Sequence, residues 1–214
     1  MKCVILANGE YEEIEVYHDI VQEADIIICA DGGANYARQM GVTPGYIIGD
    51  LDSISAEVKE YFAGLNVEYQ KYPRQKDFTD LHLALALADK LGANEIILIG
   101  SLGKRLDHTL ANIYCGIEMA QKGKRIMHYS PSCTVYLVTD YLRLSGEAGD
   151  LVSVMALSDK ASGVYERGFE YPLEGVVMES CNPLGVSNVL LGGDYGEIGL
   201  KEGILAVFHY PNKK

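Results

Sequence analysis

The sequence lacks the features that mark membrane-spanning, secreted and zinc-binding proteins. No apolar run approaches the ~18 residues needed to span a bilayer. The apolar part of the segment from Met1 to Gly9 is too short for a signal peptide and predicts a first strand. The five cysteines are odd in number and contain no C-x-x-C pair, which argues against a disulfide framework or a zinc site. We therefore expect a cytoplasmic protein with reduced cysteines and no membrane partner.

Basic residues are scarce. The 214 residues contain 18 Lys and Arg against 30 Asp and Glu, which gives a net charge of −12. Nucleic acids and anionic membranes bind clustered Lys and Arg, so neither is an expected partner. A polyphosphate ligand would need local neutralisation by a cation or by a few basic residues. The chain also lacks a Walker A motif, a G-x-G-x-x-G fingerprint after its first strand, and a local Ser-His-Asp or Cys-His set.

The pattern of apolar residues predicts two domains of different class. Residues 1–128 alternate strand and helix signals at the spacing of parallel βα units. The predicted strands are 2–7, 25–30, 45–49, 66–72, 95–100 and 124–129. Residues 129–214 lose helical periodicity and contain short β-rich runs separated by Gly, Pro, Ser and Asn. We predict an N-terminal Rossmann-like, mostly parallel sheet with helices on both faces, followed by an antiparallel β-sandwich or barrel.

Three predicted helices have recognisable starts. Ser55 and Thr79 are expected N-caps, and Asp107 is expected to cap the helix that follows it. The helix from Leu81 to Leu91 is apolar almost all round, which predicts burial on two sides. Packing inside the chain and packing against a second subunit both satisfy that pattern.

Acidic turns follow the predicted strands of the first half. Asp31 follows the second strand, Asp50 and Asp52 follow the third, and further aspartates follow the next two strands: Asp77, Asp80 and Asp107. Ligands of open α/β sheets bind outside the carboxyl ends of the strands, where these turns would gather. Converging carboxylates repel one another unless a hard cation is present, and Mg²⁺ is the natural candidate.

Each aspartate also has a structural interpretation. Asp31 before two glycines could form an Asx turn, Asp107 could be only a cap, and Asp80 could merely complement the helix dipole. Asp50 and Asp52 are different, because two aspartates at the end of an apolar strand have little structural purpose. An extended backbone would point both side chains to the same side.

Basic residues share these turns. Lys76 precedes Asp77, while Lys104 and Arg105 follow a Gly-x-x-Gly loop whose N–H groups could approach an anion. Solvated surface charges are the alternative interpretation. His108 could be a base, a phosphate donor or a polar residue of the first helical turn.

Taken together, these motifs resemble those of the thiamine pyrophosphokinase family. The resemblance rests on the order and spacing of residues 30–35 (ADGGAN), 48–53 (IGDLDS), 76–81 (KDFTDL) and 103–108 (GKRLDH), and on residues 168–173 (GFEYPL) and 185–188 (GVSN). It covers nearly the whole chain. It implies an N-terminal domain that binds ATP and Mg²⁺, a C-terminal β-sandwich that holds thiamine, and a homodimer with active sites at the subunit interface. The implied reaction transfers the pyrophosphoryl group of ATP to the thiamine hydroxyl and releases AMP.

The resemblance also implies residue roles. Its metal ligands are Asp50, Asp52 and Asp77. Its residues around the nucleotide and the transferred group are Asp31, Gly32, Gly33, Asn35, Asp80, Lys104, Arg105, Asp107 and His108. Tyr171 would stack on a thiamine ring, and Ser187 and Asn188 would hydrogen-bond its pyrimidine.

Two positions depart from the family pattern. Val189 stands where an acidic residue is common, and Lys104 stands where a further glycine is common. Three other functions share part of the pattern: a pyrophosphokinase acting on another hydroxymethyl heterocycle such as a pterin, a non-catalytic protein that binds nucleotide or thiamine, and a metal phosphohydrolase.

Overall fold

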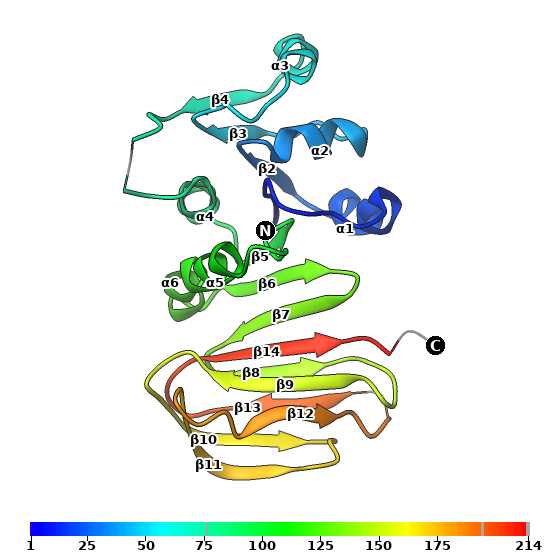
Figure 1. Ribbon diagram of the computed structural model, residues 1–214, viewed down its shortest axis with the longest axis vertical. Helices are drawn as coiled ribbons and strands as arrows, with labels where there is room; N and C mark the ends of the chain where they lie inside the picture. Colours follow the sequence, from blue (N-terminus) through cyan, green and yellow to red (C-terminus); the bar gives the residue numbers. More distant parts are fainter. Residues whose placement is uncertain (76, 194, 213–214) are drawn as a thin grey trace. The chain divides into compact units, whose positions relative to one another are not determined.

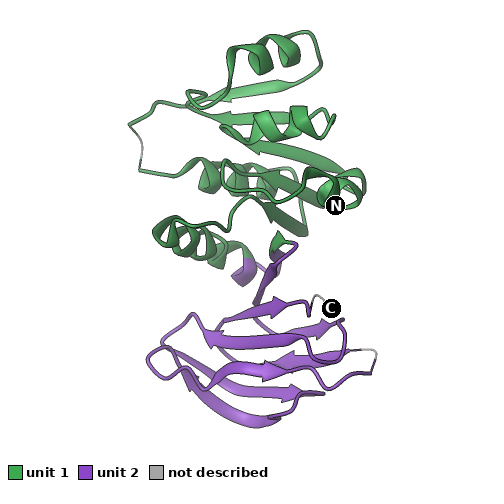
Figure 2. Cartoon of the chain, turned by 45° about the vertical axis from the view of Figure 1, so that its right-hand side comes forward, with its two compact units in different colours: residues 1–119, 128–130 green, residues 120–127, 131–214 purple. Residues whose placement is uncertain are grey.

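The computed structural model describes residues 1–75, 77–193 and 195–212, and it divides into two compact units. Unit 1 contains residues 1–119 and 128–130, and unit 2 contains residues 120–127 and 131–214 (Figure 2). The predicted division between residues 128 and 129 falls inside strand β6 (Arg125–Ser130), which contributes to both units. Within the described residues, no helix combines the length and apolarity needed to cross a bilayer.

Unit 1 is built on a parallel sheet. Its strands pair in the order β4 (Glu68–Lys71), β3 (Tyr46–Gly49), β2 (Ile26–Ala30), β1 (Lys2–Leu6) and β5 (Glu95–Ile99). The last four residues of β1 and of β5 are buried, as expected for parallel strands covered on both faces. These strands agree with the predicted ranges to within two residues. The Rossmann-like prediction is confirmed.

Helices cover both faces of this sheet. They are η1 (Ile14–Tyr17), α1 (His18–Gln22), α2 (Gly33–Gln39), α3 (Ala56–Ala63), α4 (Asp80–Lys90), α5 (Leu106–Cys115) and α6 (Ile117–Gln121), of which α6 contributes residues to both units. Figure 1 shows α1 and α2 on one side of the strands and α4 and α5 on the other.

Helix α4 is buried on two sides by its own chain. It contacts β1, β2 and β3, and it also contacts α5. Ala84, Leu85 and Ala88 are no more than 1% exposed. The predicted two-sided burial is therefore confirmed, and it arises from packing within unit 1.

The side-chain caps follow the prediction at two helices out of three. The Ser55 hydroxyl accepts a hydrogen bond from the Val58 N–H at 3.2 Å, and the Thr79 hydroxyl accepts one from the His82 N–H at 3.1 Å. The prediction for Asp107 is wrong, because α5 begins one residue earlier, at Leu106, and Arg105 occupies the N-cap position. Asp107 lies in the first turn, where its carboxylate still complements the helix dipole.

Unit 2 is a β-sandwich. One set of antiparallel strands pairs in the order β7 (Cys133–Val138), β14 (Leu205–Tyr210), β9 (Leu151–Ala156) and β12 (Gly185–Val189). The second sheet has the order β11 (Leu173–Glu179), β10 (Lys160–Arg167), β13 (Gly196–Gly199) and β8 (Tyr141–Leu144). Buried residues of both sheets form one core, including Val154 and Val207 from the first and Val164 and Ile198 from the second. The sandwich is thus the correct choice between the two predicted all-β architectures.

Candidate active site

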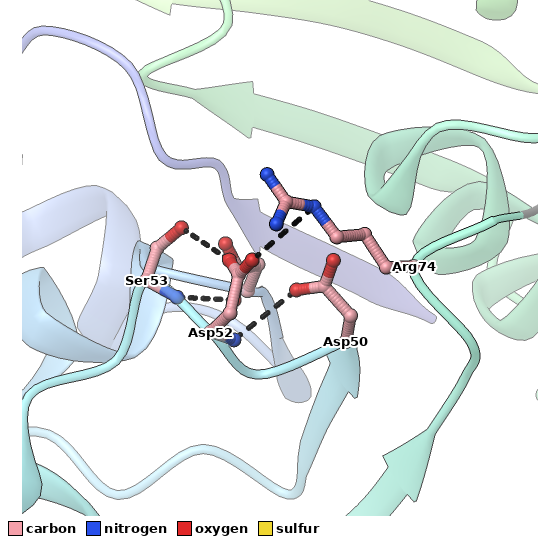
Figure 3. A network of polar contacts seen from close by, with 5 residues as sticks. Asp50, Asp52, Ser53 and Arg74 are labelled. Atoms are coloured by element: carbon pink, nitrogen blue, oxygen red, sulfur yellow. Dashed lines mark hydrogen bonds and ion pairs between the residues drawn. The ribbon is translucent and has the colours of Figure 1, made fainter.

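Three aspartates gather where two neighbouring strands of unit 1 end. Asp31 follows β2, and Asp50 and Asp52 follow β3, which pairs with β2 in parallel. One carboxylate oxygen from each of the three lies within 4.8 Å of the others. Figure 3 shows Asp50 and Asp52 side by side on the turn after β3. The predicted convergence of strand-end carboxylates is present for these three residues.

The turn that carries Asp50 and Asp52 is not extended, contrary to the sequence argument. Leu51 between them has a φ of 66°, in the left-handed region. The Asp52 N–H donates to Asp50 Oδ1 at 3.1 Å, which closes an Asx-type turn. The Ser53 hydroxyl donates to Asp52 Oδ1 at 3.1 Å, and Arg74 Nε lies 3.8 Å from Asp52 Oδ2 (Figure 3). The two carboxylates converge because the chain turns sharply between them.

Asp31 is the most buried member of this group. It is 6% exposed, has a φ of 47°, and its Oδ1 accepts a hydrogen bond from the Ser53 N–H at 3.3 Å. Asn35 fixes the same loop, because its amide donates to the Ser53 carbonyl at 3.0 Å and accepts from the Ser55 N–H at 3.1 Å. Asn35 therefore has a structural task in holding the acidic turn, alongside its predicted role near the nucleotide.

The two glycines after Asp31 allow close packing at the start of α2. A Cβ atom on Gly33 would collide with the Leu6 carbonyl group, and one on Gly32 would collide with the Asn8 side chain. A larger residue at Gly33 would push the helix away from β1, whereas one at Gly32 would have to displace the Asn8 side chain. Both glycines are therefore explained by close packing at this point of the fold.

The three aspartates fit a hard divalent cation. They offer carboxylate oxygens of graded exposure, with Asp31 buried, Asp50 intermediate and Asp52 exposed. Mg²⁺ prefers such oxygen ligands and retains several waters, which an open edge accommodates. The family resemblance implies that Asp31 lies near the nucleotide, whereas its position after the strand adjacent to β3 already predicted that it would lie with Asp50 and Asp52.

The structure does not bring Asp77 into this cluster. Asp77 is exposed and precedes α4, which begins only at Asp80. The expectation relied on Asp77 and Asp80 sharing a helix start, and that spacing argument fails because Thr79 is the N-cap. Lys76 lies outside the described residues.

Asp80 does reach the edge of the sheet. Its Oδ1 lies 2.9 Å from the position that a Cβ atom of Gly49 would occupy, and the Asp31 Cβ lies 3.2 Å from the same point. Gly49 also has a φ of 141°, which L-residues rarely adopt. A glycine at the end of β3 therefore lets Asp80 approach Asp31.

A cavity of about 730 Å³ adjoins the acidic edge within unit 1. Asp31 is common to the cavity and to the carboxylate cluster. The charged and polar residues around it are Asn8, Glu10, Asp31, Thr79, Asp80, Ser101, Lys104, Arg105, Asp107, His108, Thr109 and Asn112. This volume suits a small-molecule ligand. Of the predicted residues, Asp31, Asp80, Lys104, Arg105, Asp107 and His108 all line it.

Charged pairs occupy the mouth of the cavity. The Arg105 guanidinium donates to both Asp107 oxygens, at 3.3 and 2.6 Å, and this contact lowers the pKa of the Asp107 carboxyl. Lys104 Nζ lies 3.7 Å from Glu10 Oε1, a contact that the sequence did not predict. These pairs are exposed, so their ion pairing contributes little stability and is readily exchanged for a ligand. Four lining carboxylates against two strong bases leave a negative cavity, which favours a polyphosphate only together with a cation.

The remaining predicted residues lie in unit 2. Tyr171 is 62% exposed, and Ser187 is exposed with a φ of 64°. Asn188 is 4% exposed, and its amide donates to the Tyr171 carbonyl at 2.8 Å and accepts from the Tyr171 N–H at 3.0 Å. The Asn188 side chain thus binds the backbone of Tyr171 and leaves the Tyr171 ring free of this contact.

Fold and site define a class of protein. A parallel α/β sheet that presents carboxylates and an adjoining cavity at the carboxyl ends of its strands is typical of enzymes that handle phosphorylated ligands. Here that unit is followed by a β-sandwich with a separate set of polar and aromatic residues.

Comparison with known proteins identifies the family. Residues 17–128 match the model for "Thiamin pyrophosphokinase, catalytic domain", and residues 141–205 match that for "Thiamin pyrophosphokinase, vitamin B1 binding domain". The chain belongs to the thiamin pyrophosphokinase family, and the resemblance seen in its motifs is confirmed.

Individual relatives agree with this assignment. Thiamine pyrophosphokinase 1 of Oryza sativa subsp. japonica is 32% identical over 136 residues, covering 54% of this chain and 51% of the relative. The chain thus spans about half the length of the rice relatives that it matches. Thiamine pyrophosphokinase of Bacillus subtilis is 27% identical over 209 residues, which cover 96% of this chain and 97% of the relative.

The fold is also that of solved members. A crystal structure of thiamine pyrophosphokinase from Bacillus subtilis has a TM-score of 0.86 at 24% identity and covers both chains completely. Thiamin pyrophosphokinase from Candida albicans has a TM-score of 0.80 at 18% identity, covering 98% of this chain and 88% of that one. The two-domain fold is therefore shared across bacterial and fungal relatives.

Proposed function

We propose that this protein transfers the pyrophosphoryl group of ATP to the hydroxyl group of thiamine, giving thiamine diphosphate and AMP. The observation that carries the proposal is the cluster of Asp31, Asp50 and Asp52 beside a cavity that also holds Lys104 and Arg105. Membership of the thiamin pyrophosphokinase family supports it, as does the match of unit 2 to the vitamin B1 binding model.

In this reaction the thiamine hydroxyl oxygen attacks the β-phosphorus of ATP. The bond from that phosphorus to the oxygen bridging it to the α-phosphate breaks, and AMP leaves. The hydroxyl proton passes to a nearby carboxylate or to water. Catalysis of such an in-line displacement depends mostly on positioning and on charge stabilisation.

The residues of the cavity divide these tasks. Lys104 and Arg105 exchange their exposed partners Glu10 and Asp107 for phosphate oxygens and so neutralise part of the polyphosphate charge. His108 adds a further hydrogen-bonding group at the mouth. Asp80, at the start of α4, would orient the phosphates through water or through a bound cation.

Asp31, Asp50 and Asp52 would hold Mg²⁺. When bound, this ion would neutralise charge on the phosphate oxygens of ATP. The ligand set needs the sharp turn at Leu51 and the bracing of that turn by Asn35 and Ser53.

One assay tests the reaction and separates it from the alternatives. We expect AMP to appear when the protein is incubated with ATP, Mg²⁺ and thiamine, and not when thiamine is left out. A hydroxymethyl pterin in place of thiamine is expected to give no AMP. Release of phosphate or AMP without an acceptor would indicate a hydrolase, and absence of all turnover would indicate a binding protein; either result would contradict the proposal.

A second test addresses the acidic cluster. Asp52→Asn keeps the size of the side chain and removes a ligand charge, so we expect turnover to fall by about a hundredfold or more while the far-UV circular dichroism is retained. Asp19→Asn is the matched control, because Asp19 lies on α1 of the same unit with a side chain that is 99% exposed. Near-normal AMP release by Asp52→Asn would contradict the metal role.

We further propose that the protein acts as a homodimer with its active sites at the subunit interface. An exposed apolar stripe on α5 supports this, because Leu106, Leu110 and Tyr114 are 74%, 56% and 55% exposed at a spacing of four residues. Residues at this spacing share one helix face. Exposed apolar groups that form one stripe are typical of interaction surfaces.

We also propose a cytoplasmic location. All five cysteines are free thiols, with Cys3 and Cys29 buried, as is usual for proteins of a reducing compartment. Labelling of the thiols in cell extracts, before and after reduction, checks this. Reactivity that appears only after reduction would contradict it.

A further inference from the structure

A glutamate is buried in the β-sandwich of unit 2. Glu166 lies on β10 and is 0% exposed. Its Oε2 accepts a hydrogen bond from the Asn188 amide at 2.9 Å, while its Oε1 is buried and has no hydrogen-bond partner among the described residues. Burial of a carboxylate with one unpaired oxygen costs folding free energy. Packing alone therefore does not explain a glutamate at this position.

Asn188 connects this carboxylate to the exposed surface. Its amide nitrogen donates to both Glu166 and the Tyr171 carbonyl, and its Oδ1 accepts from the Tyr171 and Val189 N–H groups. Every donor and both acceptor positions of the side chain are therefore used within the chain. Asn188 has no hydrogen-bonding capacity left for a ligand, and its task is to hold the backbone of Tyr171.

Backbone pairing leads up to this point and ends there. Phe169 forms a bridge with Leu190, and the Glu170 N–H donates to the Val189 carbonyl at 2.9 Å. At Tyr171 the Asn188 side chain supplies the donor and the acceptor that a neighbouring strand would supply. The 62% exposed ring of Tyr171 thus projects from a backbone held by one amide group.

The ionisation of Glu166 decides which way that amide faces. A carboxylate only accepts hydrogen bonds, so an ionised Glu166 requires the amide nitrogen to face it and leaves Oδ1 for the Tyr171 N–H. A protonated Glu166 can donate instead, and the amide could then turn its oxygen toward Glu166. Turning would set an NH₂ group against the Tyr171 N–H and break that contact.

Among the residues that the structure describes, no other titratable group faces Glu166 from the elements packed on it. Its inward-facing neighbours on β9, β11, β12 and β13 are apolar or glycine: Val154, Met178, Gly185 and Ile198. The charged residues of those elements are in exposed contacts elsewhere: Arg167 with Glu174, Lys160 with Glu179, and Glu197 with the Tyr141 hydroxyl. Burial raises the pKa of Glu166 to about 7, and the hydrogen bond from Asn188 lowers it in part.

We propose that Glu166 is a positioning residue for acceptor binding, which in its ionised form holds Tyr171 in place through the amide of Asn188. This inference rests on the proposed function, because Tyr171 meets the thiamine ring only in that reaction. Thiamine binding is then tightest when Glu166 is ionised and weakens as Glu166 is protonated.

The chain contains no tryptophan, so Tyr171→Trp introduces a single fluorophore at the position in question. Without any ligand, we expect the emission of this variant to change with pH, with a midpoint near about 7. Adding Glu166→Gln should abolish the change and leave the emission at its low-pH value, because glutamine resembles the protonated acid. Adding Glu170→Gln, which removes the exposed carboxylate next to Tyr171, is the matched control and should leave the transition unchanged.

Steady-state kinetics on the chain with Tyr171 intact supply the second arm. We expect the KM for thiamine to be about tenfold higher at pH 6 than at pH 8, with the KM for ATP unaffected. Glu166→Gln should keep the high KM for thiamine at both values. Any titration of thiamine itself affects both proteins equally, so it cancels in the ratio of their KM values for thiamine.

Either arm can overturn the inference. Emission that does not depend on pH, or a transition that survives Glu166→Gln, contradicts the coupling. Equal pH profiles of the thiamine KM in the two proteins contradict the role in acceptor binding. If the emission transition depends on Glu166 but no thiamine binds at any pH, the proposed function fails while the coupling of Glu166 to Tyr171 stands.

Discussion

At the scale of single residues, two neighbours in the sequence of unit 2 have different environments in the structure. Ser187 and Asn188 are adjacent in sequence and were expected to bind the same ring. The structure leaves Ser187 exposed and uses Asn188 entirely within the fold. The reason is the partner of Asn188, Glu166, which lies on another strand and has no motif of its own.

Glu166 also makes the stability of the protein depend on pH. Its pKa in the folded chain, about 7, lies above the ordinary glutamate value, so the folded state binds the proton more tightly than the unfolded state. Its contribution to stability is present in full below the unfolded pKa, near 4.5, and is lost as pH rises through the folded pKa. Between these values the loss is on the order of 3 kcal/mol.

Glu166→Gln should therefore gain stability relative to the unsubstituted protein as the pH is raised. Glutamine does not titrate, so the difference in free energy of unfolding between the two proteins should shift by roughly 3 kcal/mol in favour of glutamine between about pH 4.5 and pH 8. Urea unfolding at several pH values measures it. A difference that stays constant over this range would show that Glu166 is not titrating in the fold.

Residues of the acidic site were predictable to different degrees. Asp31, Asp50 and Asp52 could be placed together because parallel strands end at a common edge, whatever the turn conformation. Whether Asp77 lies with these three carboxylates could not be decided from sequence, because its position relative to Asp80 depends on where α4 begins. Arg74 and Glu10, which contact Asp52 and Lys104, come from loops whose path no local pattern specifies.

At the scale of elements, α4 links stability to the site. Its N-terminal residue Asp80 reaches the edge of the sheet, while its body fills the space between the sheet and α5. The sequence predicted the helix, its cap and its burial correctly, since all three follow from local pattern. What covers the helix depends on tertiary packing, and the sequence left open whether the cover comes from the same chain or from a second subunit.

The cap of α4 should contribute measurably to stability. Thr79→Ala removes the hydroxyl that accepts from the His82 N–H, and we expect a loss of about 1 kcal/mol in the free energy of unfolding. Thr79→Ser keeps that hydroxyl and should lose much less. Chemical denaturation of the three proteins measures the difference, and equal losses for alanine and serine would show that the cap is not the cause.

At the scale of the whole molecule, the alternation of strands and helices up to residue 128 and its disappearance afterwards were enough to predict two domains of different class. The pattern could not predict that β6 would contain residues of both units. Hydrophobic periodicity predicts where elements lie in the sequence, but it does not predict which unit each element packs into. It also gave no reason to choose between a sandwich and a barrel, which depends on how the strands pair.

The proposed homodimer can be tested by a substitution on α5. Leu110→Glu places a charge in the middle of the α5 stripe, and we expect it to convert a dimer into a monomer in sedimentation velocity experiments. Val177→Glu in unit 2, at a side chain that is 55% exposed, is the matched control and should sediment like the unsubstituted protein. A monomeric unsubstituted protein at micromolar concentration would contradict the proposed dimer.

The burial of α4 by its own chain has a consequence for how the protein responds to dilution. Because the hydrophobic interior of unit 1 is completed without a partner, folding of this unit is unimolecular, whereas pairing of two chains obeys mass action. The midpoint of thermal unfolding should then rise with protein concentration only to the extent that folded chains pair, because pairing stabilises the folded state by mass action. If the active sites are shared between two chains as proposed, specific activity should also decline at high dilution, which leaves a folded but inactive subunit in solution.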